Sequence, residues 1–157
     1  MSIALLLMIS TVWSSGAGSS IDAKSIQKQL AAEYRQIEES FLRNDPSAWI
    51  DKLSPDFQLT LFSGEKQNRD WVVNYVRNNA KNFRIQKLSM RIKSLEVHKS
   101  DVTAVVEQKS KRTFTDEKGQ PRTLEVGALQ RETWEHGPNG WRLTAVQEWK
   151  LLYLKKR

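Results

Sequence analysis

The sequence predicts an α+β domain in which N-terminal helices pack in a strongly curled, mainly antiparallel sheet. Between Ile21 and Arg43, apolar residues recur at spacings of three and four, as they do along one side of an α-helix. From Phe83 onward they recur at every second position, which is typical of strands with one buried face. This alternation is longest in residues 124–134 and 141–153, and the turn between them predicts a closing hairpin.

Length and composition indicate a single domain. The chain has 157 residues and a mass of 18.2 kDa, with 39% hydrophobic and 27% charged residues, which is ordinary for a globular protein. Its net charge is +7. The sequence has no cysteine, so disulfides, thiolate metal sites and cysteine nucleophiles are excluded. A domain of ~140 residues buries about two-thirds of its surface and needs no such cross-links.

Residues 1–18 are predicted to be a signal peptide. The apolar run Ile3–Val12 is too short to span a bilayer comfortably, and it is followed by small residues at Ser15 and Ala17, as a signal peptidase prefers. Because no Lys or Arg precedes the run, a truncated start and an uncleaved anchor stay open as alternatives. After processing, residues 19–157 would form one domain with no stable membrane span, secreted or in a bacterial periplasm.

The first part of the chain predicts three helices and one strand. A helix over 21–43 would bury a single stripe, and Asp45 with Pro46 would cap and start a short helix that ends near Leu53. Residues 54–56 would then break that helix, and residues 57–61 would form a strand. Asn68 or Asp70 would cap a third helix to about Asn79. The stripe of the first helix consists of Ile26, Leu30, Tyr34, Ile37 and Phe41, and the third helix would bury either Val72, Tyr75 and Val76 or Trp71, Tyr75 and Asn79.

The second part predicts three or four long antiparallel strands. Apolar residues change parity near Lys93 and Ser94, which indicates a β-bulge that bends the strand. The next strand would direct one set of side chains inward: Val102, Ala104, Val106, Gln108, Ser110 and Phe114. A turn at 116–119 then leads into the closing hairpin.

The inward face of these strands combines aromatic and polar side chains. Glu132 is the carboxylate on that face, and burial would raise its pKa, so it is the candidate general acid or base. Glutamines are neutral and both donate and accept hydrogen bonds, so they would orient a ligand. Apolar walls with a few polar groups are typical of a ligand pocket. A polar network within the core is the alternative interpretation. The candidate ligand-binding residues are Gln108, Gln130, Gln147, Trp149, Trp134 and Tyr34.

Several segments carry a resemblance to a known family, namely 41–49, 53–57, 100–106, 132–134 and 139–143, with Gln147. They resemble the nuclear transport factor two-like superfamily of cone-shaped α+β domains, which includes ketosteroid isomerases and SnoaL-like cyclases. The resemblance covers about residues 21–152 and implies a fold, not an activity. The isomerase base, tyrosine and second acid would fall near Leu61, Ile37 and Gln130, which lack the required groups, so that reaction is not expected.

Together these patterns predict an exported domain that binds a small, partly apolar ligand in a pocket lined by Trp and Gln. One alternative is an acid/base enzyme of the cyclase or isomerase type that uses Glu132. Another is an interaction module that forms a homodimer through its outer sheet face. No cofactor is predicted. The two histidines, His98 and His136, lack acidic neighbours at ligand spacing, so no metal site is predicted. Because no outward aromatics accompany the basic residues, nucleic acid is not an expected partner.

Overall fold

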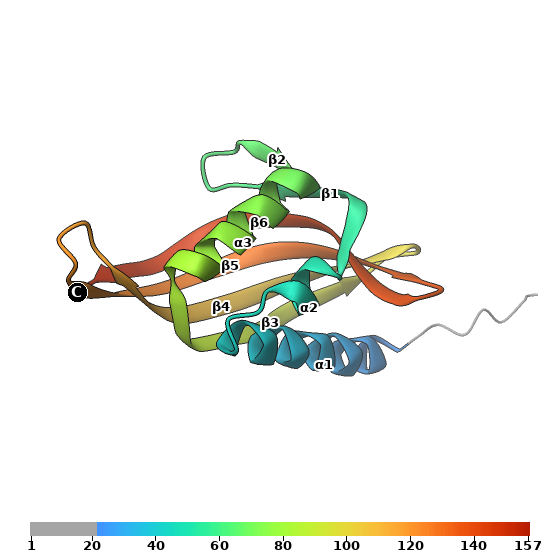
Figure 1. Cartoon of the computed structure of the whole chain (residues 1–157). Helices are drawn as coiled ribbons and strands as arrows, with labels where there is room; N and C mark the ends of the chain where they lie inside the picture. The colour runs from blue at the N-terminus through green and yellow to red at the C-terminus, as the bar shows by residue number, and fades with distance from the viewer. Residues whose placement is uncertain (1–21) are drawn as a thin grey trace, which may run out of the picture.

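The computed structural model describes residues 22–157, in which three helices lie against a six-stranded sheet (Figure 1). The predicted signal peptide lies outside the described residues. The described part contains no helix that is long and apolar enough to cross a membrane. In chain order the elements are α1 (Ala23–Leu42), α2 (Ser47–Ile50), β1 (Leu53–Thr60), β2 (Lys66–Asn68), α3 (Arg69–Asn82), β3 (Arg84–Val97), β4 (Asp101–Thr115), β5 (Pro121–Gly137) and β6 (Gly140–Lys156).

Helix α1 follows the predicted stripe. The Asp22 side chain caps its first turn by accepting a hydrogen bond from the N–H of Lys24 at 3.3 Å. Its buried residues include Ile26, Leu30, Tyr34 and Ile37, so the predicted spacing is confirmed. The helix ends where Asn44 takes a left-handed conformation with φ of 62°, which asparagine tolerates better than most residues.

The short second helix ends earlier than predicted. It stops at Ile50, and Leu53 instead begins β1, where it pairs in parallel with Leu143 of β6. The expected break at residues 54–56 is an irregular part of the same strand: the register shifts between Leu53 and Gln58. Pro55 lies in this interval, and proline has no N–H to donate to a ladder.

Helix α3 is capped by Asn68, whose side chain accepts from the N–H of Trp71 at 3.0 Å. It buries Val72 and Val73. Neither predicted set is buried in full, because Trp71 and Tyr75 are both partly exposed to solvent and stack on each other, with ring centroids 4.9 Å apart.

The sheet has the strand order β2-β1-β6-β5-β4-β3. It is mixed because β1 pairs in parallel with β6, while the other pairs are antiparallel, so the α+β and mainly antiparallel predictions are confirmed. The bulge predicted near Lys93 is confirmed by a register shift between Ile92 and Ser94. The sheet is bent by such bulges but is not strongly curled, contrary to the prediction. The sheet has two free edges, β2 and β3, and does not close into a barrel, so its topology does not require strong curvature.

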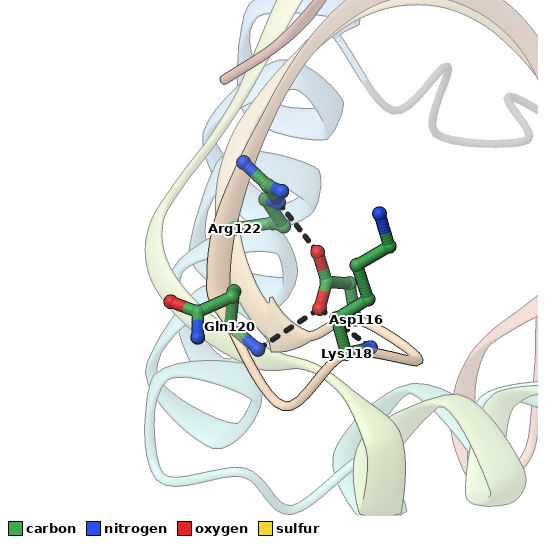
Figure 2. A network of polar contacts seen from close by, with 4 residues as sticks. All are labelled: Asp116, Lys118, Gln120 and Arg122. Carbon is green, nitrogen blue, oxygen red and sulfur yellow. Dashed lines mark hydrogen bonds and ion pairs between the residues drawn. The ribbon is translucent and has the colours of Figure 1, made fainter.

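A tight turn joins β4 to β5 and fixes their long antiparallel register (Figure 2). Oδ1 of Asp116 accepts from the backbone N–H groups of Lys118 and Gln120, both at 2.9 Å, and Oδ2 accepts from Nε of Arg122 at 2.7 Å. Gly119 provides the positive φ of 75° that this turn requires.

Bulges in the β5–β6 hairpin change which residues of β6 face the helices. Thr133 pairs with Ala145 and Trp134 pairs with Leu143, so Thr144 is an extra residue and the alternation shifts by one. Val146 is therefore buried, whereas Gln147 is exposed. The inward facing predicted for Gln147 and Trp149, beyond the bulge, was wrong for this reason.

Candidate functional site

A cleft of about 300 Å³ lies between the helices and the inner face of the sheet. Helices α1 and α3 provide mostly apolar walls, and β4, β5 and β6 provide polar groups. The helix side includes Ile37, Phe41, Trp49, Val72, Tyr75 and Val76, and the polar strand residues are Gln108, Arg112, Gln130, Glu132 and Glu148.

Glu132 lines this cleft with a carboxyl group that is almost fully buried. Its exposure is 1%. Oε2 accepts hydrogen bonds from the Tyr34 hydroxyl at 2.7 Å and from Nε1 of Trp134 at 3.1 Å. Within residues 22–157, no donor bonds Oε1. The carboxyl group therefore has one oxygen held by the protein and one that can interact with a molecule in the cleft.

Burial raises the pKa of Glu132 from 4.5 to about 7, and the hydrogen bonds from Tyr34 and Trp134 oppose this rise. A group with a pKa near neutrality is populated as both acid and base at physiological pH. Glu132 therefore has the protonation behaviour that general acid or base chemistry requires.

Tyr34 and Trp134 contact the buried Oε2 atom of Glu132 and do not line the cleft. Nε1 of Trp134 also donates to the Tyr34 hydroxyl at 3.0 Å, and the two rings meet edge to face at 5.7 Å. Burial, followed by the charge of Glu132, raises the pKa of Tyr34 well above 10.0, so its hydroxyl stays protonated and donates. The prediction that both aromatic residues contact the ligand is therefore corrected: they position Glu132.

Two of the predicted glutamines lie in the cleft and the third does not. Gln108 and Gln130 line it from neighbouring strands. The β6 bulge leaves Gln147 exposed, and Trp149 is 49% exposed under the guanidinium of Arg131, 5.0 Å from its ring centroid. Gln147 and Trp149 thus lie outside the site that the sequence assigned to them.

The predicted site did not include Glu148, Arg112 or Trp49, although all three line the cleft. Glu148 replaces Gln147 because of the bulge, for which the sequence gives no clear signal. Arg112 shares the parity of Gln108, so alternation alone would have found it. Trp49 packs edge to face on Phe57, with ring centroids 6.0 Å apart, and also lines the cleft.

The described residues contain no group of three or more His, Asp or Glu side chains that could hold a metal ion. The polar side chains that line the cleft can supply hydrogen bonds from the glutamines, proton exchange at Glu132 and a charge from Arg112 or Glu148.

Comparison with solved structures identifies the fold. One similar structure is a type 2 hexachlorocyclohexane dehydrochlorinase, with a TM-score of 0.66 and 10% identity over 88% of this chain and 93% of that chain. Another is a ketosteroid isomerase-like protein from Erwinia carotovora atroseptica SCRI1043, with a TM-score of 0.63 and 12% identity over 81% and 96% of the two chains. A third is an NTF2-like protein of unknown function in nutrient uptake from Rhodospirillum rubrum ATCC 11170, with a TM-score of 0.56 and 17% identity over 75% and 94%.

These likenesses show that the chain has the nuclear transport factor two-like fold, as the resemblance in its sequence implied. Identities of this size show the fold alone and transfer no activity. No protein-family model and no curated protein sequence matches the chain.

Proposed function

We propose that this protein binds a small, partly apolar molecule in the cleft, with Gln108, Gln130 and Glu132 as its polar contacts. The observation that carries the proposal is a cleft of about 300 Å³ whose apolar walls are interrupted by these inward polar groups. Small-molecule sites have this composition, and their volumes begin at roughly this size.

The three polar side chains form a row across two strands. Gln130 pairs with Val106, and Gln108 pairs with Ala128, so the two glutamines are diagonal neighbours with Cα atoms roughly 7–8 Å apart. Glu132 follows two residues along β5, about 7 Å further on the same face. A molecule in the cleft can therefore meet several hydrogen-bonding groups in succession.

Fluorescence titration with the neutral apolar probe N-phenyl-1-naphthylamine tests this proposal. We expect one saturable site. Val76→Phe, which fills the cleft, should abolish binding of the probe. Gln130→Leu should weaken binding several-fold, because the probe amine would lose its hydrogen bond to the Gln130 amide. Gln147→Leu is the matched control, because it makes the same change on an exposed side chain of β6. Binding that is absent, or that survives Val76→Phe unchanged, would refute a ligand site in this cleft.

A second candidate function is acid/base catalysis by Glu132. The free Oε1 atom and the pKa of about 7 favour it. Once a substrate is identified, Glu132→Gln should abolish turnover, whereas binding should be weakened but retained, because the glutamine amide still forms hydrogen bonds but cannot exchange a proton. Turnover that persists in this variant would exclude the catalytic role.

Export of the processed chain and a homodimer through the outer sheet face stay predictions. Light scattering of residues 19–157 would test the dimer, and detection of the processed chain outside the cytoplasm would test the export.

A further inference from the structure

Arg112 places a positive charge in the cleft. It lies on β4, opposite Ile85 of β3 and Leu124 of β5, and shares the inward parity of Gln108. Its side chain is half-buried and lines the cleft, and its Nε donates to Oγ of Ser110 at 3.2 Å. The two terminal nitrogens of the guanidinium make no hydrogen bond within residues 22–157.

No acidic side chain of the described residues lies within 4.0 Å of this guanidinium, since none forms an ion pair with it. Of the acids that line the same cleft, Glu132 is held by Tyr34 at the other end, and Glu148 accepts from the N–H of Phe62 at 3.0 Å. Burial lowers the pKa of Arg112, but a guanidinium remains charged in proteins. A partly desolvated charge without a partner is costly, so an anion in the cleft would be favoured at this position.

We propose that the ligand carries one carboxylate, which Arg112 binds at the outer end of the cleft, while the apolar body of the ligand extends inward toward Gln108. This inference rests on the proposed function. Among the described residues that line the cleft, Arg112 is the one with a positive charge, so a monoanion is matched and a phosphate dianion is not. The planar guanidinium can donate two parallel hydrogen bonds to a carboxylate.

The strand geometry sets the length of the ligand. Arg112 and Gln108 are four residues apart on β4, so their Cα atoms lie roughly 13 Å from each other at the usual rise of a strand. The Arg112 side chain turns toward Ser110, which shortens this span. A chain of about five carbons between the carboxylate and an apolar end group would fill it. Ile85, which pairs with Arg112 from β3 and also lines the cleft, would help to exclude water and strengthen the ion pair.

Isothermal titration calorimetry with 6-phenylhexanoate and 6-phenylhexanamide tests the inference, because the two probes differ in charge and share their apolar body. The wild-type protein should bind the carboxylate at least about tenfold more tightly than the amide. Arg112→Gln should remove this preference and leave the amide affinity within about twofold. Arg112→Lys keeps the positive charge but cannot donate two parallel hydrogen bonds, so it should retain part of the preference for the carboxylate.

Arg131→Gln is the matched control, because Arg131 is exposed and stacks on Trp149 outside the cleft. It should bind both probes like the wild type. Equal affinity of the two probes, or an unchanged preference in Arg112→Gln, would overturn this inference and leave the proposed function intact. If neither probe binds and N-phenyl-1-naphthylamine also fails to bind, both proposals are overturned.

Discussion

Replacing Glu132 with glutamine should change how the stability of the protein depends on pH. The carboxyl group is 1% exposed, and its pKa is about 7 in the folded protein against an ordinary value of 4.5. Below about pH 4.5 the group is neutral in both the folded and the unfolded chain. Between 4.5 and about 7 it is protonated mainly in the folded chain, so folding is favoured by proton uptake.

The magnitude follows from this difference in pKa. The rise from 4.5 to about 7 corresponds to about 3 kcal/mol, at about 1.4 kcal/mol for each pKa unit. The stabilisation is fully present below pH 4.5 and is lost as the pH rises through about 7. Glutamine is neutral throughout, so Glu132→Gln should gain up to about 3 kcal/mol relative to the wild type between pH 4.5 and pH 8.5.

Urea unfolding followed by tryptophan fluorescence, repeated from pH 4.5 to pH 8.5, measures this difference. Glu135→Gln is the control, since Glu135 is exposed on the same strand and its variant should follow the wild-type profile. The difference between Glu132→Gln and the wild type must grow with pH. A constant difference across this range would refute the argument that burial without a cationic partner raises the pKa of Glu132.

Three further predictions concern neighbouring contacts and the hairpin turn. Tyr34→Phe removes the hydroxyl that bonds the buried carboxylate, so it should cost about 1–3 kcal/mol in urea unfolding and raise the pKa of that carboxylate further. Trp134→Ala should lower the free energy of unfolding by about 3–5 kcal/mol, because the Trp134 side chain is fully buried. Trp149→Ala should lower it by less than about 1 kcal/mol, because Trp149 is 49% exposed, and similar losses in the two variants would contradict the assigned orientations. The pKa of Asp116 is lowered first by the hydrogen bond from the backbone N–H of Gln120 and then by the one from Arg122, so it should lie below 3.8 in a carbon-detected NMR titration. Arg122→Gln should raise this pKa, and an unchanged pKa would contradict the contact between Arg122 and Asp116.

The sequence alone determined the fold class and much of the inner sheet face. Alternation in β4 and β5 predicted that Gln108, Gln130 and Glu132 point inward, and the structure places all three in the cleft. This worked because β4 and β5 pair without a register shift over residues 101–115. In an uninterrupted strand, parity decides the facing of every side chain. The buried stripe of α1 was also predicted correctly, because the spacing of residues along a helix does not depend on contacts with distant parts of the chain.

Only the tertiary structure decided which residues of β6 belong to the site. The bulge at Thr144 depends on how β6 pairs with β5, and it exchanges Gln147 for Glu148 in the cleft. The positioning role of Tyr34 also depends on the tertiary structure, because its hydroxyl on α1 donates to Glu132 on β5, which is far away in the sequence. Parity and helical spacing are local properties of a segment, whereas strand register and the contacts between elements depend on residues far apart in the sequence.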